Sequence, residues 1–211
     1  MKLLLVGATG LIGQAALQQA LAGADVSQVI APTRRPLPAH ARLLNPQVDF
    51  DALPVEAAWW AVDAVVCTLG TTLRAAGSRA AFRKVDHDYP LAVARHALRH
   101  GARTYVLTSA SGADPDSRIF YSRTKGEVER ALALLGYRSL TFVRPALLAG
   151  ERSEHRFTEQ LGIRIMGAMG PILPRRLRVV PAERVATALL QAARSALPGQ
   201  HVVESEQLQP D

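Results

Sequence analysis

Two side chains that could transfer a proton, Tyr121 and Lys125, stand four positions apart in the sequence. Near the start of a predicted helix, this spacing brings both onto one face. A free tyrosine has a pKa of about 10, so acid–base work near neutrality needs a lowered pKa, and a close ammonium could largely supply the roughly 4 kcal/mol required. The pair alone fits an ordinary surface helix. Only its combination with the features below favours chemistry.

Hydroxyl groups follow the predicted strand that ends at Thr108, in the order Ser109-Ala110-Ser111-Gly112. At the carboxyl end of a parallel strand, such groups face the crevice where ligands bind. Ser109 is the candidate for polarising a substrate carbonyl, because it is the first residue expected to clear the strand, and Ser111 is its rival. Both serines could instead satisfy backbone groups of the loop.

The chain opens with an apolar run, Leu3 to Val6, that breaks into a glycine-rich turn. Glycines allow a tight turn, a close approach of backbone amides to a pyrophosphate and close packing of the next helix, whose N-terminus favours an anion. The spacing is G-x-x-G-x-x-G rather than G-x-G-x-x-G, which indicates a variant of the dinucleotide-binding turn. The predicted cofactor-binding residues here are Gly7, Thr9, Gly10, Leu11, Ile12 and Gly13.

Strands and helices alternate along the chain, which predicts an α/β fold with a Rossmann-like, doubly wound parallel sheet. We expect a single domain over residues 1–211, with a small irregular substrate-side lid from Ala146 to Pro181 and a frayed tail after Glu204. The predicted strands are 3–6, 26–31, a short one near Val48, 63–67, 105–108, 140–143 and an edge strand at 201–203. The predicted helices run from about 10 to 22, 79 to 100 and 119 to 135, and a last one begins at Pro181.

Composition limits the class of protein. The 211 residues include 48% hydrophobic and 20% charged residues, enough for a sizeable core, and no apolar run approaches the length of a membrane helix. The net charge of +7 comes mostly from scattered arginines, so we expect no nucleic-acid partner. Cys67 is the only cysteine, which excludes an internal disulfide, and the histidines form no ligand-like group, so no metal is expected. A cytoplasmic location follows from the lack of a recognisable leader.

The chain resembles the short-chain dehydrogenases/reductases in their atypical NAD(P)H-binding branch, and within it the group named for a Tat-interacting oxidoreductase. The similar segments are Cys67-Thr68-Leu69-Gly70-Thr71-Thr72, Val85-Asp86-His87-Asp88-Tyr89, Gly112-Ala113-Asp114, Lys125-Gly126-Glu127-Val128-Glu129 and Arg144-Pro145. The resemblance implies that Tyr121 is the proton donor, that Lys125 also holds the nicotinamide ribose and that a serine near Ser109 polarises the carbonyl. It further implies that Asp49 and Phe50 border the adenine, and that the cofactor lies against Thr68, Leu69, Gly70, Thr71 and Pro145. Many relatives have an asparagine where this chain has Asp86, so the usual proton relay is in doubt.

Charge indicates which cofactor is preferred. An NAD-specific fold presents an acidic residue to the ribose about 20 residues past the glycines, where this chain has Arg34 and Arg35. An arginine there could pair with a 2′-phosphate, which favours NADPH over NAD, although both could be solvated loop residues.

The sequence therefore predicts an NADPH-binding oxidoreductase acting on a small carbonyl or alcohol, as a monomer or homodimer. A non-catalytic NADPH sensor that regulates a partner is the alternative. A nucleotide-sugar epimerase is disfavoured because the segment after Gly150 is short for a sugar-nucleotide domain. The substrate would be defined by 146–181 and by Thr71 and Thr72.

Overall fold

The computed structural model describes residues 1–149 and 179–209. Its centre is a seven-stranded sheet in the order β3-β2-β1-β4-β5-β6-β9, in which every neighbouring pair is parallel. The strands are β1 (Lys2–Val6), β2 (Gln28–Ile30), β3 (Leu43–Leu44), β4 (Ala64–Cys67), β5 (Thr104–Thr108), β6 (Ser139–Arg144) and β9 (Gly199–Glu204). The predicted Rossmann-like parallel sheet is confirmed. Its strand order reverses between β1 and β4, where ligands bind in folds of this kind.

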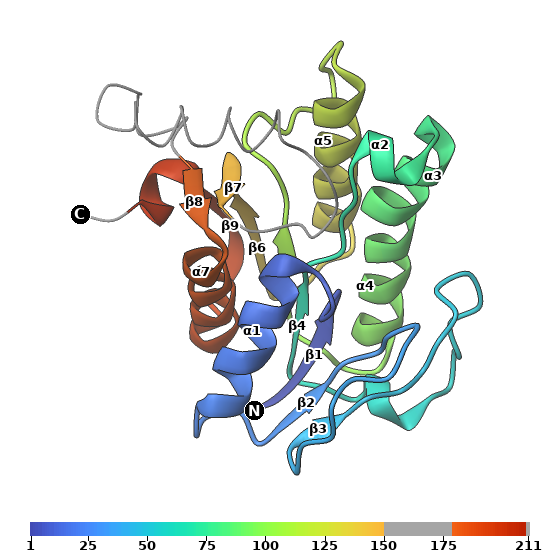
Figure 1. Cartoon of the computed structure of the whole chain (residues 1–211), viewed down its shortest axis with the longest axis vertical. Helices are drawn as coiled ribbons and strands as arrows, with labels where there is room; N and C mark the ends of the chain where they lie inside the picture. Colours follow the sequence, from blue (N-terminus) through green and yellow to red (C-terminus); the bar gives the residue numbers. More distant parts are fainter. Residues whose placement is uncertain (150–178, 210–211) are drawn as a thin grey trace.

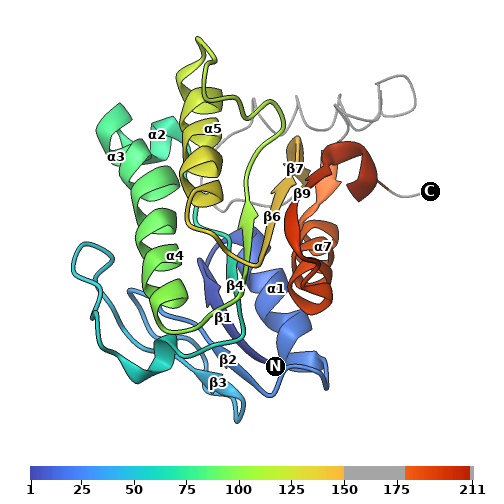
Figure 2. The ribbon, with the colours of Figure 1, turned by 180° about the vertical axis from the view of Figure 1, so that it is seen from behind.

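Helices cover both faces of the sheet (Figures 1 and 2). One apolar core joins one sheet face to α1 and α7, and a second joins the opposite face to α4 and α5. In α7 the stripe predicted from the sequence, Ala182, Val185, Ala186, Leu189 and Leu190, is fully buried. The helices are α1 (Leu11–Ala22), α2 (Leu73–Ala76), α3 (Arg79–Arg83), α4 (Tyr89–Arg99), α5 (Phe120–Ala133) and α7 (Ala182–Ser195), with 3-10 turns at Ala58–Trp60 and Ser205–Leu208. None of the described helices is long and apolar enough to cross a membrane.

The helix predicted over 79–100 is interrupted by a π-helical turn, Lys84–Asp88, between α3 and α4. Pro90 explains the interruption: it has no N–H for the carbonyl of Asp86, four residues earlier, and its ring would crowd that carbonyl. A separate helix, α2, precedes α3; Thr72 and Ser78 cap the two helices by accepting backbone N–H groups, and Gly77 between them has a φ of +76°. Asp86 therefore lies on a widened turn rather than in a regular helix.

Two predicted segments are wrong in detail. The third strand lies at Leu43–Leu44 rather than near Val48, where Gln47 forms only an isolated bridge with Thr33. The tail after Glu204 does not fray at once, because Ser205 and Leu208 of the last 3-10 turn are buried. The edge strand predicted just before this tail is present as β9, which pairs with β6. Of the predicted lid, β7 (Leu147–Ala149) and β8 (Val179–Pro181) pair in parallel, and 150–178 lie outside the described residues.

Candidate functional site

The glycine turn lies at the point where the strand order reverses, between the ends of β1 and β4. Gly7 has a φ of +88°, and a Cβ there would stand 2.7 Å from the Thr68 backbone. A Cβ on Gly13 would stand 2.0 Å from the Gly7 carbonyl oxygen. Among the described residues, a Cβ on Gly10 would meet only that oxygen, at 3.4 Å, so their packing does not require this glycine. Space above Gly10 is what a bound pyrophosphate needs.

The N-terminus of α1 is available to an anion. No side chain caps it, and its first turn has no acidic residue. Thr9 and Gly10 are exposed, Leu11 is half-buried, and Ile12 belongs to the core, so Ile12 could serve a ligand only through its backbone. An uncapped helix start with unopposed backbone N–H groups favours a phosphate.

Arg34 and Arg35 are exposed, and neither guanidinium has a hydrogen bond or ion pair within the described residues. The loop that carries them is nevertheless fixed: the hydroxyl of Thr33 donates to the Arg35 carbonyl at 2.6 Å and accepts from the Asn45 amide at 2.8 Å. Two free cations on a held loop can bind an added negative group.

Asp49 and Phe50 lie on the next loop. The Asp49 carboxylate is exposed and accepts the Asp51 N–H at 2.9 Å, a local turn contact. Phe50 is half-buried and packs against the Tyr89 ring of α4, with centroids 5.5 Å apart. Within the described residues, no hydrogen bond or ion pair joins the side chains of Asp49, Arg34 or Arg35 to the rest of the predicted site.

Tyr121 is the second residue of α5 and is half-buried, with its ring tilted against Phe82 of α3 at a centroid distance of 5.6 Å. Ser109 directly follows β5 and is 4% exposed; its N–H donates to the Val143 carbonyl at 2.8 Å. The Ser109 hydroxyl has no hydrogen-bond partner within the described residues, whereas Ser111 is exposed. A buried hydroxyl without a partner is unusual and suits a group reserved for a ligand.

Lys125 lies one helical turn after Tyr121, and its ammonium is 2.8 Å from the Asp86 carboxylate. Both side chains are buried, at 5% and 1% exposure. The second Asp86 oxygen accepts the Thr71 N–H at 2.8 Å. Burial lowers the pKa of Lys125, but the Asp86 carboxylate and the Tyr121 phenol outweigh it and raise that pKa above its usual value. The ammonium is therefore kept charged inside the protein, against the loop that follows β4.

Sequence reasoning noted Asp86 only as a departure from the family pattern and missed its contact with Lys125. The two residues are far apart in the chain, so no local spacing connects them. The available signal was the pair Asp86 and Pro90, whose four-residue separation forces the widened turn that presents the carboxylate.

The five segments that carry the family resemblance meet around α5. A Cβ on Gly126 would stand 2.1 Å from the Pro115 nitrogen, so the loop after β5 lies directly on the helix. The Asp114 N–H donates to the Ser122 carbonyl at 3.1 Å, and the Ser111 N–H donates to the Pro145 carbonyl at 3.0 Å. These segments therefore lie close together, at the end of the sheet where α2, α3 and the start of α5 lie in Figure 1.

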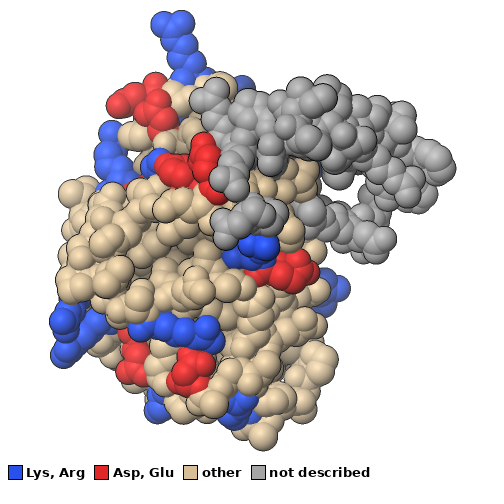
Figure 3. Space-filling model, turned by 90° about the vertical axis from the view of Figure 1, so that its left-hand side faces the viewer, with Lys and Arg blue, Asp and Glu red and all other residues tan. Residues whose placement is uncertain are grey.

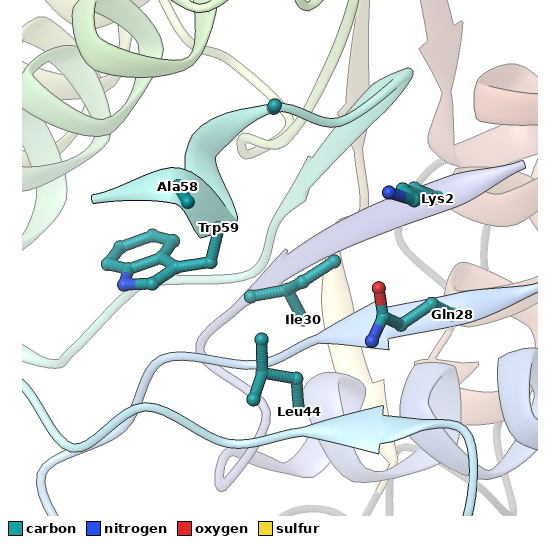
Figure 4. A pocket seen from close by; sticks show the side chains of 7 residues that line it. Lys2, Gln28, Ile30, Leu44, Ala58 and Trp59 are labelled. Carbon is teal, nitrogen blue, oxygen red and sulfur yellow. The ribbon is translucent and has the colours of Figure 1, made fainter. Parts of the chain in front are cut away.

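Two surface features lie outside this site. A cavity of about 290 Å³ lies over β1–β3 and beside the 3-10 turn at Ala58–Trp60; it is lined by Ile30, Leu44 and Trp59 and by Lys2 and Gln28 at the amino-terminal starts of β1 and β2 (Figure 4). On the face shown in Figure 3, basic side chains lie in separate groups with acidic ones beside them rather than in one stripe. The Arg175-Arg176-Leu177-Arg178 run lies outside the described residues.

Comparison with known proteins gives both relatives and a shared fold. No family model matches the chain. Protein FMP52, mitochondrial, of Eremothecium gossypii is 39% identical over 159 residues, which cover 74% of this chain and 70% of the relative. Protein fmp52, mitochondrial, of Emericella nidulans is 34% identical over 178 residues, covering 80% and 76%.

The solved structures share the fold at lower identity. MoeE5 in complex with UDP-glucuronic acid and NAD has a TM-score of 0.74 and 20% identity, over 96% of this chain and 75% of that one. The oxidoreductase ylbE from Lactococcus lactis has a TM-score of 0.68 and 18% identity, over 99% and 95%. The chain thus shares its fold with a protein solved in complex with NAD and with a protein described as an oxidoreductase.

The expected cytoplasmic location is contradicted. Both relatives above are named as mitochondrial proteins, as is FMP52 of Saccharomyces cerevisiae. The expectation rested on the lack of a recognisable leader at the start of the sequence, which is weak ground for assigning a compartment.

Proposed function

This chain belongs to the FMP52 family, and we propose that it is an oxidoreductase that uses a nicotinamide dinucleotide, by preference NADPH, to reduce a small carbonyl compound or oxidise the corresponding alcohol. The observation that carries the proposal is the buried Lys125 ammonium one turn from Tyr121, against the loop after β4. A lysine is costly to bury, and this one lies where the strand order places a ligand.

The residues of the chain fit such a cofactor. Gly10 leaves room that the described residues do not fill, and the uncapped start of α1 offers N–H groups to a pyrophosphate. Lys125 and the Gly70–Thr71 loop would hold the nicotinamide end. Phe50 would border the adenine, as the resemblance implies.

When bound, the dinucleotide supplies or accepts the hydride. Tyr121 would give its phenolic proton to the carbonyl oxygen as negative charge develops there, and Lys125 would stabilise the phenolate that remains. Ser109 would donate its unpartnered hydroxyl to the same oxygen. In alcohol oxidation each residue acts in reverse.

The preference for NADPH is supported by Arg34 and Arg35, which lie on the loop after β2 and have no acidic partner among the described residues. An added 2′-phosphate would gain charge-assisted hydrogen bonds there. Within the superfamily we propose that the chain lies close to the Tat-interacting oxidoreductase group, because the five shared segments converge on Lys125. Neither statement depends on the other.

The test combines binding and turnover. Tyr121→Phe is expected to keep its NADPH affinity and to lose turnover by roughly 100- to 10,000-fold, since only the proton donor is removed. Turnover is followed as NADPH consumption with a panel of aldehydes, ketones and quinones. Tyr137→Phe is the matched control: it also removes one phenolic hydroxyl, but that hydroxyl donates to the Ala94 carbonyl, away from the site.

Two outcomes contradict the proposal. Full turnover in Tyr121→Phe would remove the mechanism. NADPH that binds to the native chain but is never consumed with any member of the panel would favour the alternative, a sensor whose bound state regulates a partner.

A further inference from the structure

The carboxylate of Asp86 is held by two different parts of the site. One oxygen lies 2.8 Å from the Lys125 ammonium, and the other accepts the Thr71 N–H at 2.8 Å. A Cβ on Gly70, just before Thr71, would lie 3.5 Å from the carboxylate, so the loop passes directly over it. One buried group therefore fixes the position of the lysine and of the loop after β4.

The position of Asp86 in the fold is unusual. It lies on the π-helical turn Lys84–Asp88, and such turns occur mostly as single insertions that are frequent at functional sites. The oxygen that faces Lys125 lies at ion-pair distance from the ammonium, and it accepts no hydrogen bond from any other group within the described residues. The contact with Lys125 is therefore what satisfies this buried oxygen.

We propose that Asp86 is a positioning residue for Lys125: its carboxylate holds the ammonium one turn from Tyr121, keeps it protonated and ties the Thr71 loop to the same point. A neutral side chain of the same size, such as asparagine, could not supply the negative charge of this ion pair. The inference rests on the proposed function for the part that Lys125 plays with the cofactor.

The charges around Lys125 decide what removal of Asp86 does. The groups that act on the ammonium are Asp86 from the π-helical turn, Tyr121 from its own helix and Cys67 from β4. Burial raises the pKa of the Cys67 thiol, so it stays neutral near pH 7. In Asp86→Asn the burial of Lys125 is no longer opposed by a carboxylate, and its pKa falls below the usual value.

This lower pKa of Lys125 changes how the stability of the protein depends on pH, which can be measured without a cofactor. In Asp86→Asn the unfolded chain binds a proton at lysine that the folded chain does not, so stability rises with pH up to about 10.4, the usual lysine pKa. In the native chain the raised pKa has the opposite sign: the stabilisation is present below about 10.4 and is lost only as pH rises through the higher folded value. Relative to the native chain, the Tm of Asp86→Asn should rise by about 4 °C per pH unit in which folded Lys125 is neutral.

Glu129→Gln is the matched control. It also removes a buried carboxylate, one turn further along α5, but its partner Arg144 keeps its proton at every pH used. Its Tm difference from the native chain should be independent of pH. The double variant Asp86→Asn with Lys125→Met should lose the pH-dependent rise and so assign it to Lys125.

The positioning role is tested by measuring NADPH affinity and turnover as functions of pH. In Asp86→Asn, NADPH affinity should weaken by about tenfold as pH rises and the ammonium loses its charge, whereas the native chain should show no such change. The alkaline limb of kcat should move to lower pH, with KM for the carbonyl substrate within about threefold of the native value. A merely structural residue would change neither profile.

Each result decides the proposal. A Tm difference that is the same at every pH would show that Lys125 does not depend on Asp86 for its charge, which overturns it. A pH-dependent Tm with unchanged NADPH and kcat profiles would reduce the pair to a structural contact and also overturn the positioning role. If the native chain binds no nicotinamide dinucleotide, the proposed function fails, and the Tm comparison alone still decides whether Asp86 holds the charge.

Discussion

Helix α5 carries two buried ionic side chains one turn apart, Lys125 and Glu129, and the structure treats them differently. The Glu129 carboxylate accepts two hydrogen bonds from Arg144 of β6, at 3.0 and 2.5 Å, and Arg144 also donates to Glu204 of β9 at 3.0 Å. Among the described residues Lys125 has one counter-ion, Asp86, and the Asp86 oxygen that faces the ammonium has no other hydrogen-bond partner there. The Arg144 group closes a network, and the Lys125 group leaves capacity unused.

The surroundings of Lys125 and of Arg144 differ in the same way, in whether their buried polar groups have hydrogen-bond partners. Four buried side-chain atoms have no hydrogen-bond partner within the described residues, and three belong to Asp86, Thr108 and Ser109. Thr108 and Ser109 lie at the carboxyl end of β5. The fourth, Ser139, begins β6 at the opposite end of the sheet. Asp86 is matched by the Lys125 ammonium, so the hydroxyls of Thr108 and Ser109 are the polar groups left unpaired at the carboxyl edge of the described sheet. Native proteins pair nearly all buried polar groups, and such a pattern is what a ligand-binding edge would show.

The largest effect is expected when the unpartnered hydroxyls at the two ends of the sheet are removed one at a time and the variants are compared. Ser109→Ala should lower turnover by roughly 100- to 1,000-fold, as loss of one donor to a developing oxyanion does. Ser139→Ala, the matched control, should leave turnover unchanged. Neither should lower the free energy of unfolding by more than about 0.5 kcal/mol, because neither hydroxyl has a hydrogen bond to a described residue that it could lose.

Steady-state turnover and urea unfolding measure these effects. Ser111→Ala belongs in the same series, because the sequence alone left it as the rival. A large loss in Ser111→Ala with none in Ser109→Ala would reverse the assignment and show that an unpartnered hydroxyl is a poor guide to the site here.

For the network of Arg144 with Glu129 and Glu204 we predict the opposite pattern, a loss of stability without a loss of turnover. Glu129→Gln should lower the free energy of unfolding by about 2 kcal/mol, less than the roughly 3–5 kcal/mol typical of a broken buried pair, because Arg144 keeps Glu204. Turnover and NADPH affinity should stay within about twofold of the native values. A loss of turnover larger than the loss of stability explains would mean that the Arg144 network also shapes the site.

The sequence predicted those parts of the fold and site that depend on local order. The strand, glycine turn and helix at the start of the chain follow from residues that are neighbours in sequence. The close contact that requires Gly13 is also local, with the Gly7 carbonyl, whereas the contact that requires Gly7 comes from Thr68 after β4. The apolar period of α7 is equally local. The strand β3 has only two residues, too few to show an alternation of apolar and polar positions, so its place was missed.

The remaining features depend on contacts between distant segments. Lys125 and Asp86 come from different elements, and only the folded sheet places them together. The break of the helix over 79–100 was readable in principle, because Pro90 removes a helical hydrogen bond. The predicted helix nevertheless continued through Pro90 to residue 100.

Arg34 and Arg35 extend the comparison to the surface, since they are cations that the described structure leaves without partners. Replacing both by alanine should weaken NADPH binding by about tenfold, the smallest effect considered, because solvent screens exposed charges. NADH affinity should change by less than about twofold, and the free energy of unfolding should not fall. Arg99→Ala is the control, because that arginine is also exposed but pairs with Glu56. Equal loss of NADPH and NADH affinity would show that the two arginines contact something other than a 2′-phosphate, and an unchanged ratio would leave Lys125 and the turn at Gly10 as the groups that bind the dinucleotide.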